Sequence, residues 1–248
     1  MIKEKRRKKK RRMLALKIVF GVLVTLVLAF LVVFYVFRVE DVEVKGNVLY
    51  DKPTIESVVL NDEYSWNSLY VFLKYKLVDT KDVPFIDTME VSLKNPTTLQ
   101  IQVYEKGMVG YLYLPSLGQN VYFDKDGIVV EISDRVIPEV PFISGITFQE
   151  VELYKKLPME SNELRSLLSL TQALKKYGIL PTEISYGVEN APGLIYGGVT
   201  VLMGDLTLQT PKLERVVQIL PSLAEQAGTL HMENWTEETT DIVFDRAQ

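Results

Sequence analysis

His231 is the only histidine in the chain, and there is no cysteine. A catalytic pair with a histidine general base would therefore have to use His231. This residue lies in a short apolar stretch, residues 229–232, which favours a structural or solvent-facing strand side chain. A zinc hydrolase needs several ligands, and one histidine cannot supply two imidazoles. Thiolate and disulfide chemistry are excluded by composition.

Carboxylates are abundant, and glycan cleavage needs only two of them about 5–9 Å apart. Their placement argues against that use, because Glu43 and Asp87 fall on the polar faces of predicted strands. Asp124 and Asp126, followed by a glycine, resemble part of a calcium loop, but the twelfth residue from Asp124 is Arg135 rather than the closing Glu. A hairpin turn is the preferred interpretation.

Three serines, Ser65, Ser133 and Ser144, could be proposed as nucleophiles, but none lies in a Gly-x-Ser-x-Gly elbow. Trp66, Trp235 and the thirteen tyrosines could stack on glycan, although aromatic residues in small sheet domains belong more often to the core or to an interface. The sequence gives no catalytic, cofactor-binding or metal-binding residue. We therefore expect a protein that is not an enzyme and needs no cofactor.

The most specific stretch is residues 18–37, which contain no charged side chain. Twenty residues at about 1.5 Å rise each span about 30 Å, the thickness of the hydrocarbon layer of a bilayer. No small-x-small cleavage site follows at Val36 to Val39, so an uncleaved anchor is favoured over a signal peptide. We predict a cytoplasmic basic tail at 1–13 and a single transmembrane helix at 14–37.

Charge predicts the orientation of this anchor. Residues 3–12 hold nine Lys or Arg and one Glu, and such a flank stays in the cytoplasm. Residues 1–37 contain ten basic residues and one acid, which leaves 18 basic and 31 acidic residues beyond them, a net charge of −13. An exported region that is so acidic is a poor partner for nucleic acid. We expect everything after residue 38 to be extracytoplasmic.

The exported part predicts two α+β domains, 38–106 and 107–248. The first has the order strand, helix, helix, strand, strand: a strand ends at Gly46, Pro53 begins a short helix, and Leu69, Phe72 and Leu73 form the apolar face of a second helix. Two alternating strands follow, joined by a turn at 95–97.

The second domain is predicted to have a mostly antiparallel sheet. It contains a hairpin at 121–132, a Pro-rich loop at 136–146 and a long helix with Leu164, Leu167, Leu168, Thr171 and Leu174 on one face, ended by Gly178. A second hairpin is expected at 199–208, a helix from Thr210 that Pro221 interrupts, and a last strand at 240–244.

The first domain resembles a POTRA domain, on the strength of its element order and of two segments, VEVKGN at 42–47 and NPTTLQIQVYE at 95–105. With a membrane anchor directly upstream, the chain resembles the FtsQ family of bacterial cell-division proteins, called DivIB in many Gram-positive bacteria. Only the POTRA part and the hairpin with its Pro-rich loop are specific. In the rest of the chain, the order of the predicted elements is consistent with the second domain of that family.

This resemblance implies a non-enzymatic protein of the divisome, at the division septum of the cell membrane. Family members bind other bitopic proteins, FtsL and FtsB or DivIC, and help to regulate the septal peptidoglycan synthase. The family places its main partner site on the last strands of the second domain, which maps here to Thr240, Asp241, Ile242, Val243 and Phe244. The mechanism implied is strand addition at an exposed sheet edge.

Two other classes of function remain open. A membrane-anchored extracytoplasmic enzyme acting on wall polymers would show a deep pocket that gathers several acids or arginines. A POTRA-bearing translocation or assembly component would need a barrel or a tandem array of such domains, and the sequence contains neither.

Overall fold

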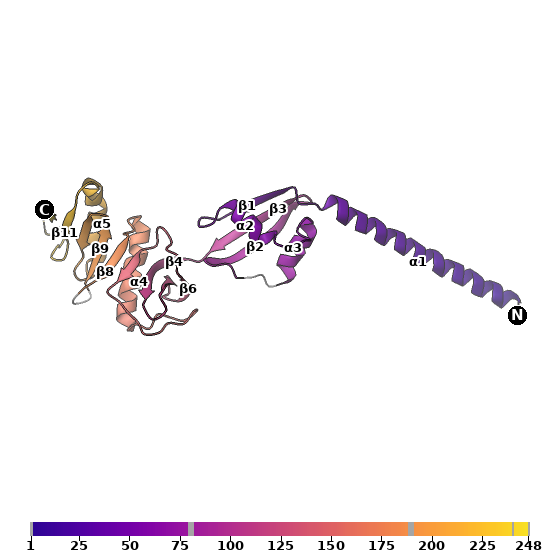
Figure 1. The fold of residues 1–248 in the computed structure, drawn as a ribbon, viewed down its shortest axis with the longest axis horizontal. Coiled ribbons are helices and arrows are strands. Elements are labelled where there is room, and N and C mark those ends of the chain that lie inside the picture. Colours follow the sequence, from indigo (N-terminus) through magenta and orange to yellow (C-terminus); the bar gives the residue numbers. More distant parts are fainter. Residues whose placement is uncertain (1, 79–81, 188–190, 240, 248) are drawn as a thin grey trace. The chain divides into compact units, whose positions relative to one another are not determined.

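The computed structural model describes residues 2–78, 82–187, 191–239 and 241–247, with side chains from residue 13 onward. The chain divides into two compact units, Met1–Glu105 and Lys106–Gln248 (Figure 1). Both contain helices and strands, so the protein is of the α+β class, as predicted.

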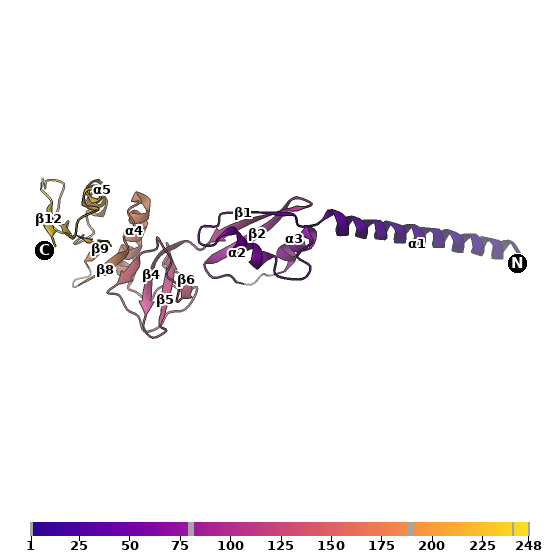
Figure 2. The same cartoon turned by 45° about the horizontal axis from the view of Figure 1, so that its top comes forward.

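The first unit begins with one long helix, α1 (Ile2–Val36). Its segment Met13–Val36 has a mean hydropathy of 2.9 and is fully exposed, which makes it long and apolar enough to cross a membrane. Among the residues that the structure describes, this segment is the one candidate membrane span, and it lies at the predicted place. Figure 2 shows α1 leading into the folded part of the unit.

The folded part of the first unit is a three-stranded sheet with two helices. The strands have the order β1-β3-β2, in which β1 is parallel and β2 antiparallel to β3. A core with Ile55, Val59, Leu99 and Ile101 fully buried joins the helices to the sheet. The elements are β1 (Asp41–Lys45), α2 (Lys52–Val59), α3 (Ser68–Leu77), β2 (Ile86–Asn95) and β3 (Thr98–Glu105), in the predicted order.

The apolar face predicted for α3 is wrong. The residues of this helix that are buried are Ser68 and Val71, whereas Leu73 is 42% exposed. Apolar residues occur all around α3, so the sequence offered a second face that looked equally suitable for the core.

The second unit is built on a nine-stranded sheet with the order β12-β11-β10-β9-β8-β7-β4-β5-β6. Five of its eight neighbouring pairs are antiparallel, in agreement with the predicted sheet type. The strands are β4 (Met108–Leu114), β5 (Gln119–Asp124), β6 (Val129–Ser133), β7 (Phe142–Ser144), β8 (Glu183–Tyr186), β9 (Pro192–Tyr196), β10 (Val199–Leu202), β11 (Gly228–His231) and β12 (Val243–Arg246).

Two helices pack against each other and share the core of this sheet: α4 (Ser161–Tyr177) and α5 (Gln209–Ile219). Gly178 follows α4 in the left-handed conformation, with φ of 68°, as the sequence predicted. Pro221 lies in a separate 3-10 turn, η2 (Leu220–Leu223), so the helix restarts there.

Two predictions in this unit are wrong. Residues 199–208 do not form a hairpin, because β10 pairs with β9 before it and with β11 after it, and the chain then turns into α5. The Pro-rich loop contains β7, which lies between β4 and β8 in the sheet. Three residues between Pro141 and Gly145 are too few for alternation to reveal a strand.

Candidate functional site at the C-terminal sheet edge

The site predicted at the last strand lies at one end of the nine-stranded sheet. The strand itself is displaced from the prediction: β12 covers Val243–Arg246, while Asp241 and Ile242 precede it. Thr240 lies outside the described residues. Because β12 ends the strand order, its outer side has no partner strand within the described part of the chain.

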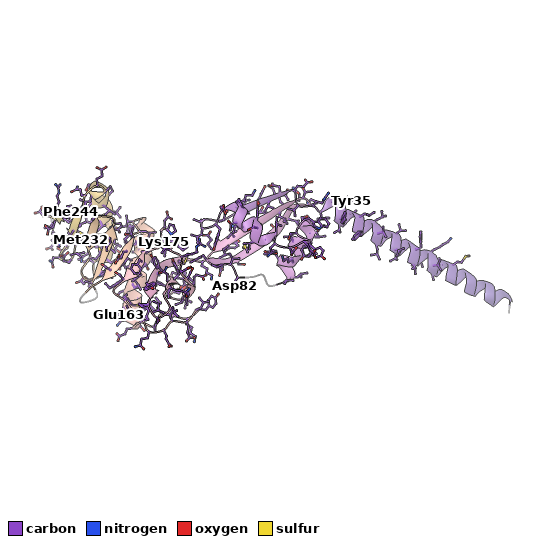
Figure 3. The ribbon with its side chains drawn as sticks, in the orientation of Figure 1. Tyr35, Asp82, Glu163, Lys175, Met232 and Phe244 are labelled. Atoms are coloured by element: carbon purple, nitrogen blue, oxygen red, sulfur yellow. The ribbon has the colours of Figure 1, made fainter. Side chains whose placement is uncertain are left out.

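The predicted alternation of side chains in this segment is confirmed. Ile242 and Phe244 pack against the core of the unit, whereas Asp241 and Val243 are exposed, the latter to 55%. Figure 3 labels Phe244 and Met232, a buried residue of the same core, in the C-terminal region. Phe244 thus anchors a strand whose other face is open to solvent.

The direction of the backbone groups in β11 follows from its bonds to β10. Gly228 N donates to Gly198 O at 3.0 Å, and Met232 N donates to Leu202 O at 2.9 Å. The backbone N–H and C=O groups of the even-numbered residues of this strand therefore point toward β10. These groups alternate in direction along a strand, so the backbone groups of residues 229 and 231 point toward β12.

The register pairs Val243 and Asp245 with those two residues. Ala247 N donates to Ala227 O, directly before β11, at 2.9 Å and continues the same alternation. Val243 and Asp245 are thereby assigned to the bonds with β11. Phe244 and Arg246 direct their backbone N–H and C=O groups to the outer edge, where an added strand would bind.

One histidine joins the last two strands. His231 Nδ1 lies 2.7 Å from Glu233 Oε1, and His231 Nε2 lies 3.2 Å from Asp245 Oδ2 on β12. The bond to Glu233 raises the pKa of His231, partial burial opposes the increase, and the charge of Asp245 adds to it. A protonated imidazole donates to both carboxylates and holds β12 against β11.

This arrangement predicts a pH-dependent contribution to stability. A raised folded-state pKa makes the contribution complete below the unfolded value, about 6.5, and removes it as the pH rises through the folded value. The difference in unfolding free energy between wild type and His231→Gln should therefore be larger at low pH than at high pH. Urea titrations at pH values below and above about 6.5, followed through the tryptophan fluorescence, would measure this difference in unfolding free energy. A difference that does not change with pH would contradict the assignment.

A hollow of about 330 Å³ lies over the exposed side of β11 and β12. Three carboxylates line it, those of Glu233, Asp241 and Asp245. Two polar atoms nearby are buried without a hydrogen-bond partner in the described part of the chain, Glu233 Oε2 and Trp235 Nε1. The surface beside the open edge is therefore acidic, and an acceptor and a donor without a partner lie buried beneath it.

Lys212 supports the turn that follows β11, and sequence reasoning missed it. Its Nζ donates to Met203 O at 2.7 Å, to Asp205 O at 3.2 Å and to Glu233 O at 3.3 Å, and the residue is only 2% exposed. A lysine in an amphipathic helix normally predicts a solvated side chain, so the sequence carried no signal for this role.

The other residues considered from sequence lie elsewhere. The Ser144 hydroxyl donates to Glu183, and Ser65 Oγ donates to Asp62 Oδ1 at 2.9 Å, so each hydroxyl is bonded to a carboxylate within its own unit. Ser133 Oγ accepts from Arg135 N at 3.2 Å.

The Asp124 segment forms the expected turn. Asp124 Oδ1 accepts from Asp126 N and Ile128 N, each at 2.9 Å, and Gly127 has φ of +76°. The Asp124 carboxylate thus closes the connection between β5 and β6. Among the residues whose placement is described, no group of three or more His, Asp or Glu side chains is arranged to hold a metal ion.

No protein-family model matches the sequence, and no curated protein matches it significantly.

Proposed function

We propose that the chain is a membrane-anchored scaffold of the bacterial division site, similar to FtsQ and DivIB, that binds other bitopic division proteins. α1 anchors it with the basic tail in the cytoplasm, and the folded part of the first unit and the whole second unit lie outside. The folded part of the first unit is then POTRA-like. Binding of FtsL and FtsB or DivIC would help to regulate septal peptidoglycan synthesis, without catalysis by this chain.

The observation that carries the proposal is the outer edge of β12. Phe244 and Arg246 present two backbone N–H and two C=O groups there, and Phe244 fixes the strand to the core. A partner segment that pairs with this edge would gain main-chain hydrogen bonds, and alternate side chains would supply specificity. The β-α-α-β-β order directly after an apolar helix supports the resemblance to the family.

The chemistry of the surface defines the partner segment further. Glu233, Asp241 and Asp245 lie beside the edge, so a strand with Lys or Arg on the matching face would be favoured. Charges at the rim of an interface act mainly on the association rate. Binding should therefore weaken as salt is raised.

Proline at Arg246 tests the edge directly, because it removes an outward N–H and leaves the bonds to β11 in place. It also favours the extended conformation that Asp245 has in β12. The Kd of the Arg246→Pro variant for the extracytoplasmic segment of the FtsB or DivIC partner should rise at least tenfold, which is a loss of about 1.4 kcal/mol of binding free energy. Proline at Val243 would be less informative, since that N–H is assigned to β11.

The matched control is Arg246→Ala, which removes the same side chain and keeps the N–H. It should bind within a few fold of wild type, and both variants should retain the wild-type melting temperature. If Arg246→Pro melts normally and binds as tightly as Arg246→Ala, β12 is not the docking edge.

One observation favours the enzymatic alternative. A hollow of about 1000 Å³ in the second unit is lined by four acids, Glu160, Glu163, Asp205 and Glu233. A general acid needs a raised pKa. Bonds from Thr207 lower the pKa of Asp205. At Glu233 burial is the largest single effect and raises the pKa, but the bond from His231, a backbone hydrogen bond and the charges of His231 and Lys212 together outweigh it, so the pKa of Glu233 is lowered too. Release of reducing ends from peptidoglycan, abolished by Glu163→Gln, would favour the enzyme.

A further inference from the structure

The outer side of α3 is apolar where a surface helix is normally polar. Tyr70, Leu73 and Leu77 are spaced i, i+3 and i+7, opposite the buried Ser68 and Val71, and Leu77 is 75% exposed. We call these three residues the α3 outer face. An apolar stripe that the core does not use indicates contact with another apolar phase.

The start of α3 is bonded to the end of α1. Asn67 uses both ends of its amide: Oδ1 accepts from Tyr70 N at 2.9 Å and caps α3, while Nδ2 donates to Val33 O at 2.8 Å in the last turn of α1. Ser68 N donates to Phe37 O at 3.2 Å. α3 therefore begins where the candidate membrane span ends.

Aromatic side chains mark the same level. The rings of Phe34 and Trp66 lie 5.0 Å apart, and Tyr35 follows at the end of α1 (Figure 3). Tyr64 and Tyr70, both exposed, lie 5.5 Å apart beside the first turn of α3. Tryptophan and tyrosine are enriched at the boundary between lipid and water because their rings have an apolar body and a polar tip.

The charges that flank this face suit the same boundary. Lys76 Nζ lies 5.3 Å from the centroid of the Phe72 ring, and Lys74 Nζ bonds to Asp62 at 2.7 Å. Long basic side chains at such a level can reach water or lipid phosphates while their stems cover apolar surface. The outer side of α3 and its surroundings thus combine apolar, aromatic and basic side chains of the kinds that occur at the boundary between lipid and water.

We propose that the α3 outer face rests in the headgroup region of the same bilayer that α1 crosses. The inference depends on α1 spanning the membrane and does not depend on the β12 edge. Its occupant is lipid because the bonds from Asn67 and Ser68 hold the start of α3 at the end of the span, where Trp66 is also exposed. The folded part of the first unit would then contact the membrane through both α1 and the α3 outer face, instead of being attached through α1 alone.

The lack of cysteine allows single spin labels on the full chain in lipid nanodiscs. Leu73→Cys and Leu77→Cys report on the face, Val27→Cys reports on α1, and Tyr104→Cys marks an exposed apolar residue on β3. β1 begins a few residues after α1, and its first residue pairs with Thr98 at the start of β3. Tyr104 lies near the other end of β3, away from α1, and therefore serves as the control. Collision with oxygen and with a water-soluble nickel chelate reads the surroundings of each label.

The labels at 73 and 77 should collide severalfold more with oxygen, relative to the nickel chelate, than the label at 104. A label at 27 that is open to the chelate would show that the premise about α1 fails. With 27 in lipid, labels at 73 and 77 that are as open to the chelate as 104 would overturn the proposal. So would labels shielded from both reagents with dipolar broadening, which would mean that a second copy covers the face.

Discussion

Replacing Lys212 with Met should destabilise the second unit by about 3 kcal/mol, because it leaves buried carbonyl groups without their donor. The three acceptors belong to Met203, Asp205 and Glu233, and they lie in the turns after β10 and β11. In a unit of this size such a loss corresponds to a fall of roughly 6–12 °C in melting temperature. Thermal unfolding followed by circular dichroism would measure it.

The matched control is Lys175→Met, the same exchange at an exposed position in the last turn of α4. It should cost only a few tenths of a kcal/mol through the helix dipole. If Lys212→Met melts like Lys175→Met, the bonds of Lys212 do not hold the turns in place, and its support of Glu233 beside β12 would have to be abandoned.

Alanine at Gly145 should be comparably severe, at about 3 kcal/mol or more, since two costs add. Gly145 has φ of +82°, in the left-handed region, and a Cβ there would lie 1.9 Å from Tyr186 O. That oxygen is main chain at the end of β8, so relief requires β7 and β8 to separate in the middle of the sheet. Chemical denaturation would report the change in unfolding free energy.

Gly178→Ala separates the two contributions to that result. Gly178 also has a positive φ, +68°, but nothing lies within 4 Å of a Cβ built there. Its substitution should cost only the conformational penalty, about 1 kcal/mol. Equal losses at the two positions would show that the contact with Tyr186 is not what requires glycine at 145.

Strongly patterned elements could be predicted from the sequence. The long helix α4 was found through its leucine spacing and Gly178, and α2 through Pro53. The long apolar helix α1, a candidate membrane span, could be predicted from length and composition alone. These features are local, because each is set by residues within a few turns of one another.

Features set by distant residues could not be predicted. The orientation of α3 was predicted wrongly because both of its faces are apolar, and only packing chooses Val71. The last strand was placed three residues too early at its start, since its position is fixed by pairing with β11. The contacts of His231 and Lys212 join segments that the sequence does not show to be neighbours.

The central claim, that a partner adds a strand to β12, makes a residue-level prediction about amide exchange. Phe244 and Arg246 direct their N–H groups outward and should exchange quickly in the uncomplexed protein, whereas Val243 and Asp245 should already be protected by β11.

Exchange measured by NMR, with and without saturating FtsB or DivIC segment, therefore tests the claim most directly. We expect the partner to slow the amides of Phe244 and Arg246 by at least about tenfold, with little change at Val243 and Asp245. Saturated binding that leaves Phe244 and Arg246 exchanging at their original rates would contradict it.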